Sequence, residues 1–274
     1  MIQDIYPKKL NNSFKNVTFS TGDELLFFDE NGQILVRLID GHVSYPKQAA
    51  LAGICTVYLF SIDEERFFLA PYETGFTMEG FSYRSLAELR AEAYGNEMLA
   101  VFTAYHLMKW YRDNRFCGRC GTALDFDDKE RAMRCPKCGN VIYPRINPAV
   151  IVGVRNGDKI LITRYNRGYA HNALVAGFTE IGETLEETVA REVMEETGIR
   201  VKNITYYKSQ PWGNAQDILM GFYCDADGDT AIKRDENELK YAEWVERDKI
   251  VLQPDDLSLT NEMMKMFKEN RDIH

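Results

Sequence analysis

Hydrophobic residues in the N-terminal part of the chain come in short runs that are separated by polar turns. Two pairs of runs predict strand hairpins, residues 24–28 with 33–36 and residues 56–60 with 66–70. The first pair flanks Asn31-Gly32, a dipeptide that favours tight hairpin turns. Residues 85–112 follow with a rough helical stripe of apolar positions, which is interrupted near Gly95. The pattern predicts an N-terminal α+β domain over residues 1–112.

After residue 144 the pattern changes to short strands around one central helix. The expected strands cover residues 149–154, 159–163, 172–176, 204–209, 218–224 and 241–245. The first two form a hairpin over Asn156-Gly157, and the third enters a turn at Gly177. The helix over residues 184–197 is the clearest in the chain, and residues 259–269 form a closing helix. We therefore expect a second folded domain over residues 144–274.

The composition is that of an ordinary globular chain. Of the 274 residues, 45% are hydrophobic and 27% are charged, which is too apolar for disorder, and no apolar run is long enough to cross a membrane. Residues 1–9 lack the apolar core of a signal peptide, so we expect a cytoplasmic protein with no membrane partner. The net charge of −9 argues against a general duplex-DNA binder. It leaves room for an anionic substrate if metal ions bridge the like charges.

Four of the six cysteines lie in two C-x2-C pairs with fourteen residues between them: Cys117, Cys120, Cys135 and Cys138. Two thiolate pairs at this spacing can bind one zinc ion tetrahedrally. The alternatives are disulfides, which are rare in the cytoplasm, and a redox C-x-x-C, which does not require two matched pairs. We expect a structural zinc ribbon over residues 113–143. Cys55 and Cys224 lie in apolar runs, where we expect them to be buried.

The central helix carries a group of carboxylates. Thr184 and Glu187 have the spacing of a capping box, which predicts the start of the helix. Three glutamates share one face within one turn, at the end where the macrodipole disfavours negative charge: Glu192, Glu195 and Glu196. Arg191 can pair with Glu187 or Glu195, which relieves only part of the repulsion. A hard cation such as Mg²⁺ or Mn²⁺ would turn the cluster into a site, whereas the alternative is a solvated acidic face.

The residues around this helix resemble the Nudix box. The chain reads Gly177-x5-Glu183-x7-Arg191-Glu192-Val193-x-Glu195-Glu196-x-Gly198-Ile199, which fills every defining position. Resemblance to the Nudix hydrolases implies an α/β/α sandwich with a mixed sheet, in which divalent metals bridge a diphosphate and activate water. It also implies that Glu192, Glu195 and Glu196 are catalytic metal ligands or their direct partners. In the same way Glu183 becomes a supporting acid, and Arg191 a residue that orients a glutamate.

The wider sequence is similar to one branch of that superfamily, the NADH pyrophosphatases. The likeness covers about residues 116–244 and includes the cysteine ribbon, the box and Ser209-Gln-Pro-Trp212. It implies hydrolysis of NAD(H) to nicotinamide mononucleotide and AMP, in some members removal of NAD caps from RNA, and a homodimer. It also implies two further Mg²⁺ or Mn²⁺ ligands, the carbonyl of Ala176 and the carboxylate of Glu238. The implied substrate-binding positions are Glu130, Tyr143, Phe178, Gln210, Pro211, Trp212 and Asp217.

Tyr143 and Phe178 are candidates to stack on the nicotinamide ring, which offers a flat face to an aromatic side chain. The alternative for both is core packing. After Trp212 the family pattern continues with two prolines, an aromatic residue and a serine, whereas this chain reads Gly213-Asn-Ala-Gln-Asp217. The change predicts a flexible polar loop in which Asp217 could repel a phosphate. NAD(H) stays the favoured substrate, and other nucleoside diphosphate-linked compounds, such as ADP-ribose or a dinucleoside polyphosphate, stay open.

A second class of function fits one further feature. Five arginines lie around the cysteines and would form a basic patch in an acidic chain: Arg112, Arg115, Arg119, Arg131 and Arg134. Such a patch suits an RNA-binding or regulatory protein with a non-catalytic Nudix scaffold, or it suits the phosphates of an NAD-capped RNA. Salt-dependent RNA binding without turnover would favour the regulatory interpretation. The complete glutamate set argues against it, because a retired site has no need of a destabilising acid cluster.

Overall fold

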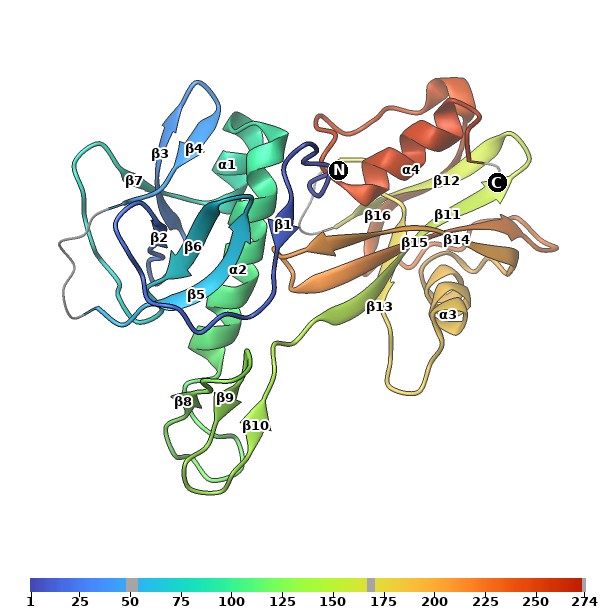
Figure 1. Ribbon diagram of the computed structural model, residues 1–274. Coiled ribbons are helices and arrows are strands. Elements are labelled where there is room, and N and C mark those ends of the chain that lie inside the picture. The colour runs from blue at the N-terminus through green and yellow to red at the C-terminus, as the bar shows by residue number, and fades with distance from the viewer. Residues whose placement is uncertain (48–53, 167–170, 273–274) are drawn as a thin grey trace. The chain divides into compact units, whose positions relative to one another are not determined.

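The computed structural model describes residues 1–47, 54–166 and 171–272 (Figure 1). The chain divides into two compact units. One contains residues 2–145 and 213–216, and the other contains Met1, residues 146–212 and residues 217–274. In the described part of the chain, no helix is long and apolar enough to cross a membrane.

The N-terminal unit contains two small sheets and a broken helix. The first sheet has the order β1-β5-β6-β2, with bounds Leu10–Asn11, Val57–Ile62, Glu65–Leu69 and Glu24–Leu26. The second sheet has the order β4-β3-β7, with bounds His42–Ser44, Ile34–Ile39 and Ser82–Arg84. The predicted helix with an interruption is confirmed as α1, a 3-10 turn and α2, with bounds Leu86–Glu92, Gly95–Glu97 and Met98–Asp113.

The two predicted hairpins have different outcomes. Strands β5 and β6 pair antiparallel, which confirms the hairpin over residues 56–60 and 66–70. The runs around Asn31-Gly32 meet in an antiparallel bridge between Phe28 and Ile34, but their strands belong to different sheets. Strand β2 pairs in parallel with β6, so that Leu25 joins a core with Phe68. The first hairpin prediction is therefore correct for the turn and wrong for the sheet, because a partner far along the chain replaces the neighbour.

The cysteine segment forms a small antiparallel sheet of its own in the same unit. Its order is β10-β9-β8, with bounds Val141–Ile142, Met133–Arg134 and Asp125–Phe126. Gly121 N–H donates to the Cys117 carbonyl at 2.8 Å, and Gly139 N–H donates to the Cys135 carbonyl at 3.0 Å. Both glycines have a φ of 71°, a left-handed conformation that glycine adopts at no steric cost. The two tight turns give the predicted ribbon its form.

The second unit is a mixed six-stranded sheet with a helix on each face (Figure 1). Five strands follow the order β14-β15-β11-β12-β16, with bounds Val201–Trp212, Asp217–Ala226, Asn147–Asn156, Lys159–Tyr165 and Leu239–Glu246. Strand β13 pairs antiparallel with β11, and β11 runs parallel to β15. The remaining elements are β13, α3, a 3-10 turn and α4, with bounds Val175–Phe178, Leu185–Thr197, Arg247–Lys249 and Leu259–Lys268. The predicted α/β/α sandwich is confirmed.

The central strand β11 shows why the sheet is covered on both sides. Alternate residues of a strand point to opposite faces. Val150, Val152 and Val154 share a buried cluster with Val189 and Val193 of α3. Ala149 and Ile151, which alternate with these valines, belong to the cluster on the α4 side, which also contains Leu259 and Met263. Both faces of β11 are therefore core, and the sheet holds α3 in a fixed orientation.

The predicted turn at Gly177 is wrong. Strand β13 runs through this residue, which pairs with Val150 of β11. A side chain at this position has no space, because an added Cβ would lie 1.9 Å from Cδ of Glu192. Glycine in a strand can mark the close approach of another group, and here that group is a carboxylate from α3.

Candidate functional site

Helix α3 begins and ends where its sequence predicts. Thr184 N–H donates to Glu187 Oε2 at 2.8 Å, and Glu187 N–H donates to Thr184 Oγ1 at 3.2 Å, which completes the capping box. Gly198 ends the helix with a φ of 71°. Val189 and Val193 are fully buried against the sheet. These local interactions fix the rotation of the helix and therefore the positions of its glutamates.

Glu196 is the most buried carboxylate of α3, with 1% of its surface exposed. The Tyr165 hydroxyl donates to its carboxylate, with oxygen–oxygen distances of 3.1 and 3.3 Å. Burial, together with repulsion from Glu192 and Glu238, raises the pKa of Glu196 to about 8. A carboxylate buried among like charges is destabilised when ionised, and a cation would offset that cost.

Glu192 and Glu195 lie progressively closer to solvent. The Glu192 side chain is 12% exposed and fills the space beside Gly177. Burial is the main cause that raises its pKa, and repulsion from Glu195 and Glu238 adds to the effect. The Glu195 side chain is 60% exposed. The three glutamates thus form a graded series from the sheet to the surface.

Arg191 neutralises part of this cluster. Its guanidinium donates to both oxygens of Glu183 at 2.6 and 2.9 Å, to Glu192 at 2.7 Å and to Glu195 at 3.0 Å. These hydrogen bonds are the main cause that lowers the pKa of Glu183 to about 2. The expected pairing of Arg191 with Glu187 is wrong, because the Glu187 carboxylate is held in the capping box. The main partner is Glu183, a pairing that was not predicted from the sequence.

The donor set fits a hard divalent cation. Mg²⁺ and Mn²⁺ prefer oxygen ligands, and the site offers the carboxylates of Glu192, Glu195, Glu196 and Glu238 and the carbonyl of Ala176. Repulsion from Glu238 contributes to the raised pKa of both Glu192 and Glu196. Among the described residues, the cysteines alone bring three or more ligand atoms within 4.8 Å of one another. Arg191 holds Glu192 and Glu195, so a cation would compete with this guanidinium for them.

Tyr165 belongs to this site and was missed in the sequence. It is the last residue of β12, and its hydroxyl accepts a hydrogen bond from Ala176 N–H at 3.0 Å while it donates to Glu196. The signal that could have found it is strand alternation. Leu161 faces the α3 side of the sheet, and Tyr165, four residues further along β12, faces the same side.

The four cysteines of the ribbon lie close enough together to bind one metal ion. Their sulfurs all lie within 4.8 Å of one another, and three pairs are 3.5 to 3.6 Å apart. Ligands about 2.3 Å from one zinc ion would stand about 3.8 Å apart at the corners of a tetrahedron, whereas bonded sulfurs are about 2.0 Å apart. Hydrogen bonds with Thr122 lower the pKa of Cys120 to about 6, which favours the thiolate that binds a metal. The ribbon therefore binds structural zinc.

The two other cysteines differ from each other. Cys224 is fully buried in the core on the α3 side of the sheet, as predicted. Cys55 is exposed and precedes strand β5, so the prediction that it is buried was wrong. Strand β5 begins at Val57, so Cys55 lies before the strand although it belongs to the same apolar run of the sequence.

The two aromatic candidates for ring stacking are both exposed. Phe178 is 52% and Tyr143 is 56% exposed, so the alternative of core packing was wrong for both. Phe178 ends β13 next to the box, and its carbonyl accepts a hydrogen bond from Arg191 at 2.9 Å. The Tyr143 hydroxyl donates to Glu130 Oε1 at 2.8 Å, which brings two predicted substrate-binding residues together. Each ring leaves surface for a flat ligand to contact.

Gln210 has a structural role instead of the predicted contact with substrate. The residue is completely buried, its Nε2 donates to the Leu257 carbonyl at 2.8 Å, and its Oε1 accepts from Leu259 N–H at 2.7 Å. These bonds hold the start of α4. Of its neighbours at the end of β14, Pro211 is exposed and Trp212 is partly buried.

The segment after Trp212 is packed, which corrects the expectation of a flexible loop. An added Cβ on Gly213 would lie 2.0 Å from the Phe102 carbonyl oxygen, and Gln216 is buried and accepts a hydrogen bond from Arg145 at 2.8 Å. Asp217 is 6% exposed, and its Oδ1 has no hydrogen-bond partner among the described residues. Burial raises the pKa of Asp217 to about 6. Close packing against a helix backbone replaces the rigidity that prolines would supply.

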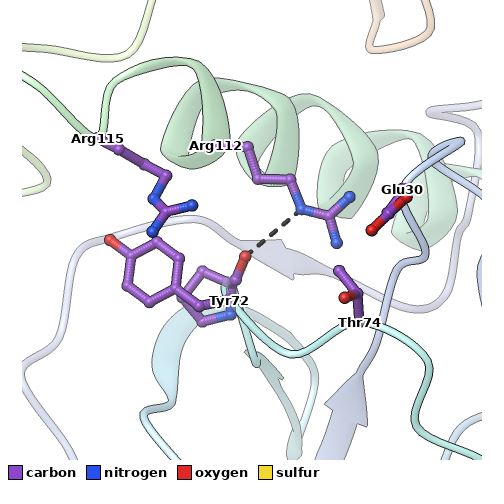
Figure 2. A pocket seen from close by; sticks show the side chains of 6 residues that line it. Glu30, Tyr72, Thr74, Arg112 and Arg115 are labelled. Atoms are coloured by element: carbon purple, nitrogen blue, oxygen red, sulfur yellow. Dashed lines mark hydrogen bonds between the residues drawn. The ribbon is translucent and has the colours of Figure 1, made fainter.

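Of the five arginines in the predicted basic patch, Arg115, Arg119 and Arg134 are exposed, whereas Arg112 and Arg131 are partly buried. Arg131 is partly buried and donates to the Asn12 side chain at 2.7 Å and to the Leu59 carbonyl. Arg134 pairs with Asp127 at 2.6 Å. Figure 2 shows the pocket where Arg112 and Arg115 lie, with Tyr72, Thr74 and Glu30 around them. Arg112 donates to the carbonyls of Phe28, Asp29 and Pro71, and Arg115 lies 4.9 Å over the ring of Tyr72. Arg112 and Arg131 therefore help to hold the N-terminal unit together, and the basic patch of the exposed arginines stays a prediction.

Comparison with known proteins agrees with both parts of the site. Residues 145–267 match the NUDIX domain family, and residues 112–143 match the NADH pyrophosphatase zinc ribbon domain. A crystal structure of a NUDIX hydrolase from Nitrosomonas europaea has a TM-score of 0.51 and 22% identity, and the match covers 57% of this chain and 92% of that one. The fold and the ribbon together define a Nudix-domain protein that carries a zinc ribbon.

Two relatives identify the family within the Nudix hydrolases to which the chain belongs. The NAD-capped RNA hydrolase NudC of Pseudomonas aeruginosa (strain LESB58) is 32% identical over 216 residues, which are 78% of this chain and 74% of that protein. NudC of Klebsiella pneumoniae (strain 342) is 45% identical over 151 residues, which are 54% of this chain and 58% of that protein. The chain thus spans little more than half the length of the relatives that it matches at about 45% identity. It belongs to the NudC family of Nudix hydrolases.

Proposed function

We propose that this protein hydrolyses the diphosphate of NAD(H) to nicotinamide mononucleotide and AMP with Mg²⁺ or Mn²⁺, and that it also removes NAD caps from RNA. The observation that carries the proposal is the graded glutamate cluster on α3, in which Glu196 is buried with a raised pKa and Glu192 fills the space beside Gly177. Such an arrangement costs stability unless a cation occupies it. The NudC relatives are named for the removal of NAD caps from RNA, which supports the substrate.

In this proposal some of the chain's residues bind the metal, and others position the metal-binding glutamates or bind the substrate. A bound divalent cation would neutralise the diphosphate and lower the pKa of a water. Glu192, Glu195, Glu196, Glu238 and the carbonyl of Ala176 would hold it. Arg191 and Glu183 would keep the outer glutamates in place, since the guanidinium contacts three carboxylates in the structure.

Substrate recognition would use exposed aromatic rings. Phe178 and Tyr143 would stack on the nicotinamide, and Glu130 would hold the hydroxyl of Tyr143, as it does in the structure. Pro211, Trp212 and Asp217 would border the substrate. We also propose a cytoplasmic homodimer with domains over residues 1–112, 113–143 and 144–274. Sedimentation equilibrium of the full chain at about 63 kDa would support the dimer, and a single species at 31.6 kDa would exclude it.

The test uses purified protein, NADH and either metal, with AMP measured by chromatography. Glu195→Gln and Glu196→Gln should each lower turnover by about 100-fold or more, because the loss of even an outer partner of a metal ligand costs 10 to 100-fold. Glu186→Gln is the matched control, since Glu186 lies on the same helix and is exposed. Parent-like turnover by both cluster variants would exclude the proposal.

A second candidate substrate class comes from the segment after Trp212. Its packing on α2 and the buried Asp217 differ from what the family pattern leads one to expect. The difference makes another nucleoside diphosphate-linked compound the second candidate substrate. A panel of NADH, NAD, ADP-ribose, a dinucleoside polyphosphate and NAD-capped RNA, with products identified, decides between them. Cleavage of ADP-ribose without cleavage of NADH would replace the substrate but keep the reaction.

The RNA-binding alternative rests on a smaller basic patch than the sequence predicts, formed by the exposed Arg115, Arg119 and Arg134. Arg131 and Arg134 are engaged within the N-terminal unit, and Arg112 is bonded to three carbonyls. Salt-dependent binding of RNA with no hydrolysis of any diphosphate in the panel would still establish it.

A further inference from the structure

The hydroxyl of Tyr165 links two of the groups that would hold the divalent cation. It accepts a hydrogen bond from Ala176 N–H at 3.0 Å and donates to the carboxylate of Glu196, whose oxygens are 3.1 and 3.3 Å away. A phenol has one hydrogen to donate, and the carbonyls of Ala176 and Leu174 are farther, at 3.4 and 3.5 Å. Donation to the carboxylate is therefore the better-formed bond, and the backbone N–H fills the acceptor side.

The fold directs this side chain toward the site. Tyr165 closes β12 at the point where β16 has one extra residue, because Arg164 pairs with Tyr241 and Tyr165 pairs with Leu239. Bulges of this kind re-aim strand ends and are common beside active sites. The next residue, Asn166, is tied to the backbone of Glu238, since its N–H donates to the Glu238 carbonyl at 2.8 Å. The end of β12 thus touches Glu196, Ala176 and Glu238, three of the groups assigned to the cation.

We propose that Tyr165 is a positioning residue, which orients the Glu196 carboxylate and fixes the Ala176 peptide so that both present oxygen to one divalent cation. The proposal rests on the proposed function, because it takes its ligand set from it. Without the hydroxyl, Glu196 loses its hydrogen-bond donor in a buried position and the Ala176 N–H loses its partner. Partners of this kind set ligand orientation, and their loss costs 10 to 100-fold in metal affinity.

The central experiment measures Mn²⁺ binding to the full chain without substrate, by the electron paramagnetic resonance signal of free Mn²⁺. Tyr165→Phe keeps the ring and removes the hydroxyl, and it should weaken binding 10 to 100-fold. Tyr241→Phe is the matched control: Tyr241 lies on the neighbouring strand β16, and its hydroxyl donates to Glu243 at 3.0 Å. Parent-like Mn²⁺ affinity of Tyr165→Phe would overturn the proposal.

Kinetics and a double-mutant cycle separate positioning from a general loss of structure. Tyr165→Phe should need more Mn²⁺ for half-maximal NADH turnover, with the KM for NADH unchanged at saturating metal. Because Tyr165 acts in part through Glu196, the loss of Mn²⁺ affinity caused by Tyr165→Phe should be smaller in a Glu196→Gln background than in the parent, and the remainder is its effect on the Ala176 peptide. Full additivity of the two effects would contradict the proposal. The cycle also holds if Tyr165→Phe is less stable, because a global loss of structure would add to the effect of Glu196→Gln.

The binding measurement keeps this inference distinct from the proposed function. A parent protein that binds Mn²⁺ but cleaves no diphosphate would refute the function and leave the role of Tyr165 to be judged by binding. A parent that cleaves NADH, with a Tyr165→Phe variant that binds Mn²⁺ equally well, would refute the role and leave the function intact.

Discussion

At the scale of single residues, two glycines show how one residue type answers to two different constraints. Gly177 faces the end of a side chain, since an added Cβ would lie 1.9 Å from Cδ of Glu192. Gly213 faces a fixed backbone, since an added Cβ would lie 2.0 Å from the Phe102 carbonyl oxygen. A flexible carboxylate can move aside at small cost, whereas a helix backbone cannot. The first glycine therefore protects the geometry of the site, and the second protects the fold.

We expect opposite effects from the same substitution at these positions. Gly177→Ala should displace Glu192 and weaken Mn²⁺ binding about 10-fold or more, while it changes the free energy of unfolding by only about 1 kcal/mol. Gly213→Ala should cost about 1–3 kcal/mol of stability through overpacking, with little change in Mn²⁺ affinity of the folded protein. Urea unfolding and Mn²⁺ titration check both. Equal losses of affinity in the two variants would contradict this assignment.

At the scale of elements, local signals predicted well and distant ones did not. Helix α3 was predictable to its ends because capping residues, a periodic apolar face and Gly198 all act within the helix itself. Strand β2 was misassigned because its partner β6 lies about forty residues along the chain. Gly177 was misread as a turn because its constraint is a side chain from another element. The glutamates could be predicted because they all lie on one helix. Tyr165 was not predicted, because it contacts them from a different element of the fold.

The segment between β14 and β15 leads to a prediction about pH. Asp217 is buried, and its pKa rises from 3.8 to about 6. Between about pH 4 and 6 the unfolded chain ionises this group first, so the parent loses stability as pH rises through that window. Asp217→Asn should be as stable as the parent near pH 4 and more stable above pH 7, by up to about 3 kcal/mol.

The check is urea unfolding at several pH values between 4 and 8. Asp248→Asn serves as the control, because Asp248 is exposed and the substitution should give no such trend. A stability difference for Asp217→Asn that stays constant across the range would show that Asp217 is not destabilised by its burial.

At the scale of the whole molecule, the net charge of −9 is unevenly distributed along the chain. Part of it is the glutamate cluster of α3, to which the proposed function assigns a divalent cation. Two of the opposing arginines, Arg112 and Arg131, are partly buried in the N-terminal unit, where they donate to backbone carbonyls. The predicted basic patch is smaller for this reason, because Arg112 and Arg131 are bonded within the fold whereas Arg115, Arg119 and Arg134 are exposed.

Zinc should contribute to the stability of the ribbon and the strands that contact it. Cys135→Ser should reduce zinc from about one to about zero atoms per chain and raise hydrogen exchange over residues 115–143, because structural zinc sites supply folding energy. Cys55→Ser is the matched control, since Cys55 is exposed and lies outside the cluster. Retention of full zinc by Cys135→Ser, measured by plasma mass spectrometry, would contradict the four-sulfur assignment.

The contacts of Arg131 have a practical consequence for dissecting this protein. This ribbon residue donates to Asn12 and to the Leu59 carbonyl of β5, and the ribbon's Phe126 ring lies 5.9 Å from that of Tyr72. A fragment that stops at residue 112 would cut α2 short and leave a carbonyl of β5 and an aromatic face bare. Such a fragment invites aggregation during expression, whereas one that ends at residue 145 retains these contacts. The N-terminal sheet and the zinc ribbon should therefore be produced as one piece.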